Sequence, residues 1–287
     1  MKPAPFRLHA PESVPDVLGL LAEHGDEAKV LAGGQSLVPM LALRLARFGH
    51  LVDVNRVRGL DAIAASDGWL RVGATARHRD LETDPSVAAQ VPLLAGATPF
   101  VGHAQIRNRG TVGGAIAHAD PAAEYPAVAV ALDAVMEVAG PGGTREVPAG
   151  SFFEGTWATA LAPDELLTAV RFPVWDGCQG VGVEEIARRQ GDFALVGVVC
   201  ALGWSGTGDR ANRAALALFG VGATPMRATA AEQLLVQGAG PIEVAAAAVE
   251  SVHPLDDLHA SGAYRRKVAG VLVRRAVQRA SEAATGA

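Results

Sequence analysis

A glycine pair in the first quarter of the chain has the residue types that bind a phosphate group. Glycine tolerates positive φ and lets a ligand approach the main chain closely. Helix formers follow the pair, so several N–H groups at the helix start are expected to point outward, with a serine able to cap them. Such a group of amides suits an anion, above all a phosphate. The segment consists of Lys29, Val30, Leu31, Ala32, Gly33, Gly34, Gln35 and Ser36.

A tight turn with a capping serine is the alternative interpretation of this segment. The segment matches neither the G-x-G-x-x-G pattern of dinucleotide-binding folds nor the P-loop pattern.

A second segment with little side-chain cover follows about eighty residues later. We expect its glycines to leave backbone amides exposed and the Thr111 hydroxyl to donate a further hydrogen bond. Two such loops could converge on the two anionic groups of a pyrophosphate. Arg107 and Arg109 either supply charge there or lie in solvent. The loop contains Gly110, Thr111, Val112, Gly113, Gly114 and Ala115.

Composition narrows the class of protein. Of 287 residues, 49% are hydrophobic and 19% are charged, which argues against disorder. The net charge of −5 argues against a nucleic-acid-binding protein. No apolar run reaches the roughly 18 residues of a membrane span. The first five residues lack the apolar core of a signal peptide, so we expect a cytoplasmic protein.

Potential metal ligands are few. Cys178 and Cys200 are the two cysteines, so no Cys₄ iron–sulfur cluster can form within one chain, and free thiols are expected. His118, Asp120 and Glu124 could be drawn as metal ligands, but surface or capping roles are the favoured interpretation.

Three units must position these segments. Residues 1–57 form a first unit with a β-α-β pattern. Its expected elements are a helix over 14–24 that begins near Ser13, a strand over 29–32, a helix over 37–48 and a strand over 50–54. Residues 58–175 form a second unit, with a strand over 70–74 and a helix over 79–83 that Pro85 ends.

The third unit covers residues 181–287, after a linker over 173–182. Strands over 196–202 and 214–219, joined by a turn at 206–209, precede a run of helices. Those helices are expected over 229–236, 242–252 and 264–284. Hairpin strands followed by amphipathic helices predict an open sheet covered by helices.

The two glycine loops together resemble the pyrophosphate-binding loops of a known family. Ala32-Gly33-Gly34-Gln35-Ser36 and Thr111-Val112-Gly113-Gly114 are similar to those of the FAD-binding subunit of molybdenum hydroxylases, such as the medium subunit of aerobic carbon monoxide dehydrogenase. Xanthine dehydrogenase carries a similar FAD module. The resemblance spans essentially the whole chain and includes Gly191-Asp192-Phe193, Pro225-Met226-Arg227 and Tyr264-Arg265.

The resemblance implies an α+β fold. A two-subdomain FAD-binding domain of the vanillyl-alcohol oxidase and p-cresol methylhydroxylase type would precede a C-terminal sheet-plus-helices flavoprotein domain. The two loops would meet the FAD diphosphate from opposite sides, and Asp192 and Phe193 would lie near the isoalloxazine. The implied cofactor-binding residues are the two segments above together with Val101, Glu124, Leu167, Asp192 and Phe193.

The sequence departs from the family pattern at two positions. Ala115 stands where the second loop commonly has asparagine, and Glu185 stands near a position where many relatives have lysine. The first departure removes a hydrogen-bonding side chain, and the second reverses a charge near the flavin. Phe193 either stacks on the flavin ring or is a core residue.

The resemblance also implies a function. The chain would hold FAD, accept electrons from a [2Fe–2S] small subunit and pass them to a final acceptor, while a molybdopterin large subunit oxidises the substrate. A dimer of such heterotrimers, without nucleic acid or a membrane span, is the expected assembly. A self-sufficient flavin oxidase and a FAD-free scaffold subunit are the alternatives. The substrate and the final acceptor (oxygen, NAD or a quinone) stay open.

Overall fold

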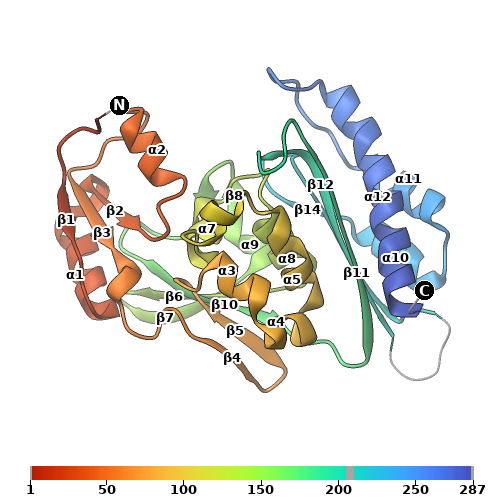
Figure 1. Ribbon diagram of the computed structural model, residues 1–287, viewed down its shortest axis with the longest axis horizontal. Helices are drawn as coiled ribbons and strands as arrows, with labels where there is room; N and C mark the ends of the chain where they lie inside the picture. Colours follow the sequence, from red (N-terminus) through yellow and green to blue (C-terminus); the bar gives the residue numbers. More distant parts are fainter. Residues whose placement is uncertain (1, 205–209, 286–287) are drawn as a thin grey trace.

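The computed structural model describes residues 2–204 and 210–285 and arranges helices and strands in three parts (Figure 1). The N-terminal part lies at one end of the molecule and the C-terminal part at the other. The turn expected at 206–209 falls outside the described residues. Among the described helices, none is long and apolar enough to cross a membrane.

The N-terminal part is a three-stranded parallel sheet in the order β1-β3-β2. Ser13 caps the first helix by accepting a hydrogen bond from the Asp16 N–H. Val17 and Leu21 on this helix are buried with Val52 of β3, so the helix covers one face of the sheet. The elements are β1 (Arg7–His9), α1 (Val14–His24), η1 (Gly25–Glu27), β2 (Ala28–Leu31), α2 (Leu37–Ala42), β3 (His50–Asp53) and η2 (Val54–Arg56).

The β-α-β pattern is confirmed, but two local predictions in this part are wrong. The helix expected over 37–48 stops at Ala42, and Arg44 then adopts a left-handed conformation with φ 57°. Such a residue interrupts the regular helix. Ser36 stands at the N-terminal end of α2 without a side-chain hydrogen bond to the helix, so it is no cap in this structure.

The middle part is an antiparallel five-stranded sheet in the order β4-β5-β10-β6-β7, covered by short helices. Helix α3 ends at Thr83 as expected, and Pro85 then opens α4 at its first turn, where proline is tolerated. The strands are β4 (Ile63–Ser66), β5 (Trp69–Gly73), β6 (Val135–Gly140), β7 (Gly143–Pro148), β8 (Phe153–Gly155), β9 (Ala158–Thr159) and β10 (Leu166–Pro173). The helices are α3 (His78–Thr83), α4 (Pro85–Gln90), α5 (Pro92–Ala97), η3 (Thr98–Phe100), α6 (Ala104–Arg107), α7 (Val112–His118), α8 (Glu124–Ala131) and α9 (Ala149–Phe152).

The C-terminal part is an antiparallel four-stranded sheet with helices on its outer face (Figure 1). Strand β10 ends at Pro173 and β11 begins at Cys178, so the linker expected over 173–182 is shorter and its second half is strand. The elements are β11 (Cys178–Ala187), β12 (Ala194–Trp204), β13 (Arg213–Phe219), β14 (Met226–Arg227), α10 (Thr229–Gln237), α11 (Pro241–Glu250) and α12 (Gly262–Thr285).

Both faces of this sheet are buried. On β12, Val196, Val198 and Cys200 pack in the cluster of the C-terminal helices. Val199 and Ala201, which alternate with them, pack in the cluster of α5 and α8 of the middle part. This arrangement explains the nearly continuous apolar run of β12, because neither face needs polar residues. It also joins the C-terminal part to the middle part through a shared core.

Candidate functional site

The two glycine loops lie against each other. A Cβ atom on Gly33 would stand 2.5 Å from the Arg109 carbonyl oxygen and 2.7 Å from the Gly110 Cα. A Cβ atom on Gly114 would stand 3.5 Å from the Ala32 Cβ. The segments are 77 positions apart in the sequence, counted between Gly33 and Gly110. Glycine is needed at the contact because any side chain at position 33 would overlap the backbone of the second loop.

The first loop offers backbone amides. Within the described part of the chain, the N–H groups of residues 33–36 donate no hydrogen bond to the protein. Gly34 has φ +73°, a conformation that favours glycine. The Gln35 side chain folds back to donate a hydrogen bond to the Gly33 carbonyl at 3.0 Å. Successive amides without acceptors are what an anion needs, so this loop fits a phosphate group.

The second loop behaves differently from the sequence-based expectation. The N–H groups of Gly110, Gly113 and Gly114 are not exposed donors, because they bond to the Ile106 carbonyl at 2.7 Å, the Ala74 carbonyl at 2.9 Å and the Thr111 hydroxyl at 3.1 Å. Thr111 Oγ1 is thus an acceptor that caps α7. The glycines serve close packing instead, since a Cβ on Gly113 would stand 2.4 Å from the Ala74 Cβ. The expectation of free amides in this loop is wrong.

Asn55 and Arg77 link the two loops, and sequence reasoning missed both. Asn55 Nδ2 donates to the Ala32 carbonyl at 2.9 Å, and its Oδ1 accepts from Arg77 Nη2 at 2.6 Å. Arg77 Nη1 then donates to the Arg109 carbonyl. Asp53 orients Asn55 by accepting from its backbone N–H at 3.0 Å. A usable sequence signal was the polar pair formed by Asp53, the last residue of β3, and Asn55 just after it, because the parallel strand β2 ends beside them.

The two arginines named from the sequence take different roles. Arg107 does not supply charge to the loops or lie in solvent: it is 11% exposed and pairs with Glu82 at 2.9 Å. Its Nη1 also donates to the Gly102 carbonyl at 2.9 Å. Arg107 therefore holds α6 and the segment before it in place. The Arg109 side chain is exposed, as the solvent interpretation expects.

The remaining predicted residues are spread over the middle and C-terminal parts. Asp192 and Phe193 lie in the connection between β11 and β12, and Phe193 is 59% exposed, so the core interpretation is wrong. This connection meets the middle part, because a Cβ on Gly191 would stand 2.4 Å from the His103 ring. Val101, two residues earlier than His103, is partly buried. Leu167 of β10 is 4% exposed and belongs to the core.

Glu124 is a buried carboxyl group at the start of α8. Burial, with the neighbouring charge of Glu185, raises the pKa of Glu124 to about 8. Burial also raises the pKa of Glu185 to about 7. Both groups therefore carry protons in a substantial part of the molecules at neutral pH. Glu185 is therefore a carboxyl group that is only partly charged at neutral pH.

His118, Asp120 and Glu124 do not form a metal site in the described residues. Asp120 accepts hydrogen bonds from the Ala122 N–H at 2.9 Å and from Trp157 Nε1 at 3.2 Å. The His118 ring stacks on the Trp157 ring with centroids 6.3 Å apart. Asp120 caps a turn, as the capping interpretation expects, whereas His118 is partly buried and Glu124 is buried, so the surface or capping interpretation does not hold for these two.

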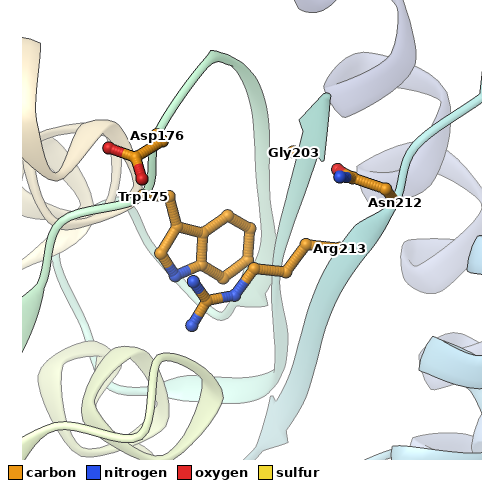
Figure 2. Close-up of a pocket in the computed structure, with 5 residues that line it drawn as sticks. All are labelled: Trp175, Asp176, Gly203, Asn212 and Arg213. Carbon is orange, nitrogen blue, oxygen red and sulfur yellow. The ribbon is translucent and has the colours of Figure 1, made fainter. Parts of the chain in front are cut away.

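A cavity of about 250 Å³ lies away from the glycine loops, between the 174–177 connection and the C-terminal sheet (Figure 2). The guanidinium carbon of Arg213 stands 4.3 Å from the centroid of the Trp175 ring, a cation–π contact. The lining residues are Trp175, Asp176, Gly203, Asn212 and Arg213. None of them belongs to the predicted site.

We expect Glu124→Gln to stabilise the protein in a pH-dependent way. A raised pKa means that the folded state retains a proton that the unfolded state releases, so wild-type stability falls as pH rises from about 4.5 to 8. Glutamine does not titrate. The stability difference between variant and wild type should grow by about 3 kcal/mol between pH 5 and 8. Urea unfolding at several pH values measures it, with exposed Glu250→Gln as control; a difference independent of pH would contradict the assignment.

Comparison with known proteins places the chain in a family. Residues 4–175 match the model of the FAD binding domain in molybdopterin dehydrogenase, and residues 182–280 match the CO dehydrogenase flavoprotein C-terminal domain. The 6-hydroxypseudooxynicotine dehydrogenase complex subunit alpha of Paenarthrobacter nicotinovorans is 38% identical, over 98% of this chain and 96% of its own length. The carbon monoxide dehydrogenase medium chain of Hydrogenophaga pseudoflava is 37% identical, with 98% of each chain covered.

Solved structures agree with the sequence relatives. A chain of the Hydrogenophaga pseudoflava carbon monoxide dehydrogenase superposes with a TM-score of 0.93 at 38% identity, with 98% of both chains covered. A chain of quinoline 2-oxidoreductase from Pseudomonas putida superposes with a TM-score of 0.92 at 37% identity, with 99% of both chains covered. The chain therefore belongs to the family of FAD-binding medium subunits of molybdenum-containing dehydrogenases.

Proposed function

We propose that this chain holds one FAD between its two glycine loops and transfers electrons from a [2Fe–2S] partner subunit to a final acceptor. The observation that carries the proposal is the row of backbone amides at residues 33–36 that donate no hydrogen bond within the described chain. These amides are held at a fixed place because Gly33 lies directly on the backbone of the second loop. Bound FAD supplies one- and two-electron transfer, chemistry that no amino-acid side chain here provides.

Each part of the site has a role in this proposal. The amides of Ala32 to Ser36 bind the diphosphate, and Lys29 to Leu31 lead the chain into that loop. The second loop, from Gly110 to Ala115, forms the opposite wall, with Asn55 and Arg77 holding both loops in register. The exposed Asp192 and Phe193 cover the cofactor from the C-terminal part, next to the segment that contains Val101.

Glu124 serves the cofactor as a neutral hydrogen-bonding group in this proposal, because its raised pKa keeps the proton on the carboxyl at neutral pH. Leu167 contributes through its backbone or the packing beneath the cofactor, since its side chain belongs to the core.

The proposed electron transfer requires partner subunits. The chain has two cysteines, of which Cys200 is buried in the C-terminal sheet, so iron–sulfur clusters have to come from another chain. We propose association with a [2Fe–2S] small subunit and a molybdopterin large subunit, in a dimer of heterotrimers. Relatives of 36–38% identity are named for carbon monoxide, caffeine, nicotine and 6-hydroxypseudooxynicotine. Because the chain is about equally similar to all of these relatives, its sequence does not indicate one substrate. We propose that the large subunit determines the substrate.

Co-purification with the partner subunits is the direct test of the proposed electron transfer. A tagged copy expressed in the native host should co-purify with an iron–sulfur subunit and a molybdenum subunit, and its FAD should be reduced by substrate only in that complex. The flavin absorbance of the isolated chain should stay unchanged when the same substrate is added. An isolated chain that oxidises a small organic substrate at the rate of the complex would establish a self-sufficient oxidase, and a purified chain that takes up no FAD would establish a scaffold.

Gly33→Val should abolish FAD retention. The valine Cβ would overlap the Arg109 carbonyl, so the two loops must separate and the amides lose their position. We expect the FAD dissociation constant to rise at least about tenfold, measured by flavin fluorescence during titration of the apoprotein. Gly142→Val is the matched control, because a Cβ there meets nothing within 4 Å. Equal FAD affinity of the two variants would show that the first loop is only a turn.

Arg77→Met should weaken FAD binding without a direct contact to the cofactor. Methionine keeps much of the apolar stem but removes the donors to Asn55 and to the Arg109 carbonyl. Loss of hydrogen bonds from a charged group predicts a roughly 10- to 100-fold weaker affinity. Arg79→Met removes a neighbouring, more exposed arginine that pairs with Glu82 at 3.3 Å and serves as the control. An Arg77 variant with wild-type affinity would contradict the role assigned to this link.

A further inference from the structure

Three histidines from distant positions meet in the N-terminal part, outside the FAD site. They are His9 at the end of β1, His24 at the end of α1 and His50 at the start of β3. One ring nitrogen of each lies within 4.8 Å of one ring nitrogen of the others. His9 Nε2 and His50 Nδ1 are 2.9 Å apart. All three side chains are partly buried.

The fold brings these rings together by a simple geometry. Strands β1 and β3 pair in parallel with Arg7 opposite His50, so His9 lies two residues further along β1, on the same face as His50. Val52 is also two residues from His50 and packs on Val17 and Leu21 of α1, which therefore crosses this face. The last residue of α1 is His24, and its ring stacks on His50 with centroids 3.6 Å apart.

The chemical form of the rings and the groups beside them decide whether the cluster can bind a metal. A neutral imidazole is the form that coordinates a metal. The Glu23 carboxylate stands 3.9 Å from His24 Nε2, within the surroundings of the cluster. This separation is beyond hydrogen-bond distance, so Glu23 does not orient the His24 ring in this structure.

The ligand set indicates the class of ion. Imidazole nitrogens suit zinc, copper, nickel and iron, whereas calcium and magnesium prefer oxygen ligands. Zinc–nitrogen bonds are about 2.0–2.1 Å long, so the nitrogens of one tetrahedral ion stand somewhat over 3 Å apart. The pair formed by His9 and His50 already has a similar spacing. A ring nitrogen of His24 lies within 4.8 Å of the corresponding nitrogens of His9 and His50.

We propose that His9, His24 and His50 bind one divalent transition-metal ion of the zinc class, with water in the remaining position. Such an ion would tie β1, an edge strand of three residues, and the end of α1 to β3. The hydrophobic core of the N-terminal part is small, and a bound metal ion adds most to the stability of units with small cores. Strand β3 also pairs with β2, which leads into the first glycine loop.

Zinc binding to the untagged full chain tests the proposal. After removal of metals with a chelator, titration of Zn²⁺ against a competing chromophoric chelator should give one bound ion per chain and a higher melting temperature. His9→Asn, His24→Asn and His50→Asn should each weaken binding at least about tenfold. His253→Asn, which changes an exposed histidine in the C-terminal part, is the matched control and should bind as the wild type does.

Wild-type zinc affinity in a variant that carries His9→Asn, His24→Asn and His50→Asn together, or equal loss in the His253 control, would show adventitious surface binding and overturn the proposal. A variant that fails to fold does not remove the test, because X-ray absorption on the zinc-loaded wild-type chain reports the ligands directly. Three nitrogen neighbours of imidazole type are expected, and a spectrum dominated by carboxylate oxygen or sulfur would overturn the proposal. FAD affinity is measured separately, so either site can fail without the other.

Discussion

The contact between Gly33 and the backbone of Arg109 and Gly110 is the constraint on which the site depends. Two segments from different parts of the fold can meet this closely only where one of them has no side chain. Asn55 and Arg77 then fix the contact with hydrogen bonds to a carbonyl on each loop. The N-terminal sheet, which supplies the first loop, is thus locked onto the middle part at the point where the amides are presented.

The backbone N–H groups of the two glycine loops have different roles. The first keeps its amides available, whereas the second uses the N–H groups of its glycines for its own helix cap and for bonds to the preceding chain. A rigid wall opposite a row of free donors is a preorganised arrangement, which lowers the cost of binding a charged cofactor. Glycine has two physical uses here: freedom of φ at Gly34 and absence of a side chain at Gly33 and Gly113.

The C-terminal part packs on the middle part and thereby positions the β11–β12 connection. Its sheet is buried on both faces, and one of these faces shares a core with α5 and α8 of the middle part. This packing delivers the β11–β12 connection, with Asp192 and exposed Phe193, to the His103 region. The same interface buries Glu124 and partly buries Glu185, which raises the pKa of both carboxyl groups. The raised pKa values of these two carboxyl groups are therefore a consequence of domain packing.

The sequence by itself indicated the two glycine loops and half of the α-helices, because turn residues and apolar periodicity are local signals, but it missed most of the strands and the short helices α4 to α9. It also identified the family, to which the matched models and relatives belong. Local signals failed at the end of α2, at the paired amides of the second loop and at the burial of Arg107. The Gly113 N–H and the Arg107 side chain find their partners, the Ala74 carbonyl and Glu82, at distant positions. Only the tertiary structure brought Asn55 to Arg77 and three histidines into one cluster, since hydrogen bonds and ring contacts across 22 to 41 positions leave no periodic pattern in the chain.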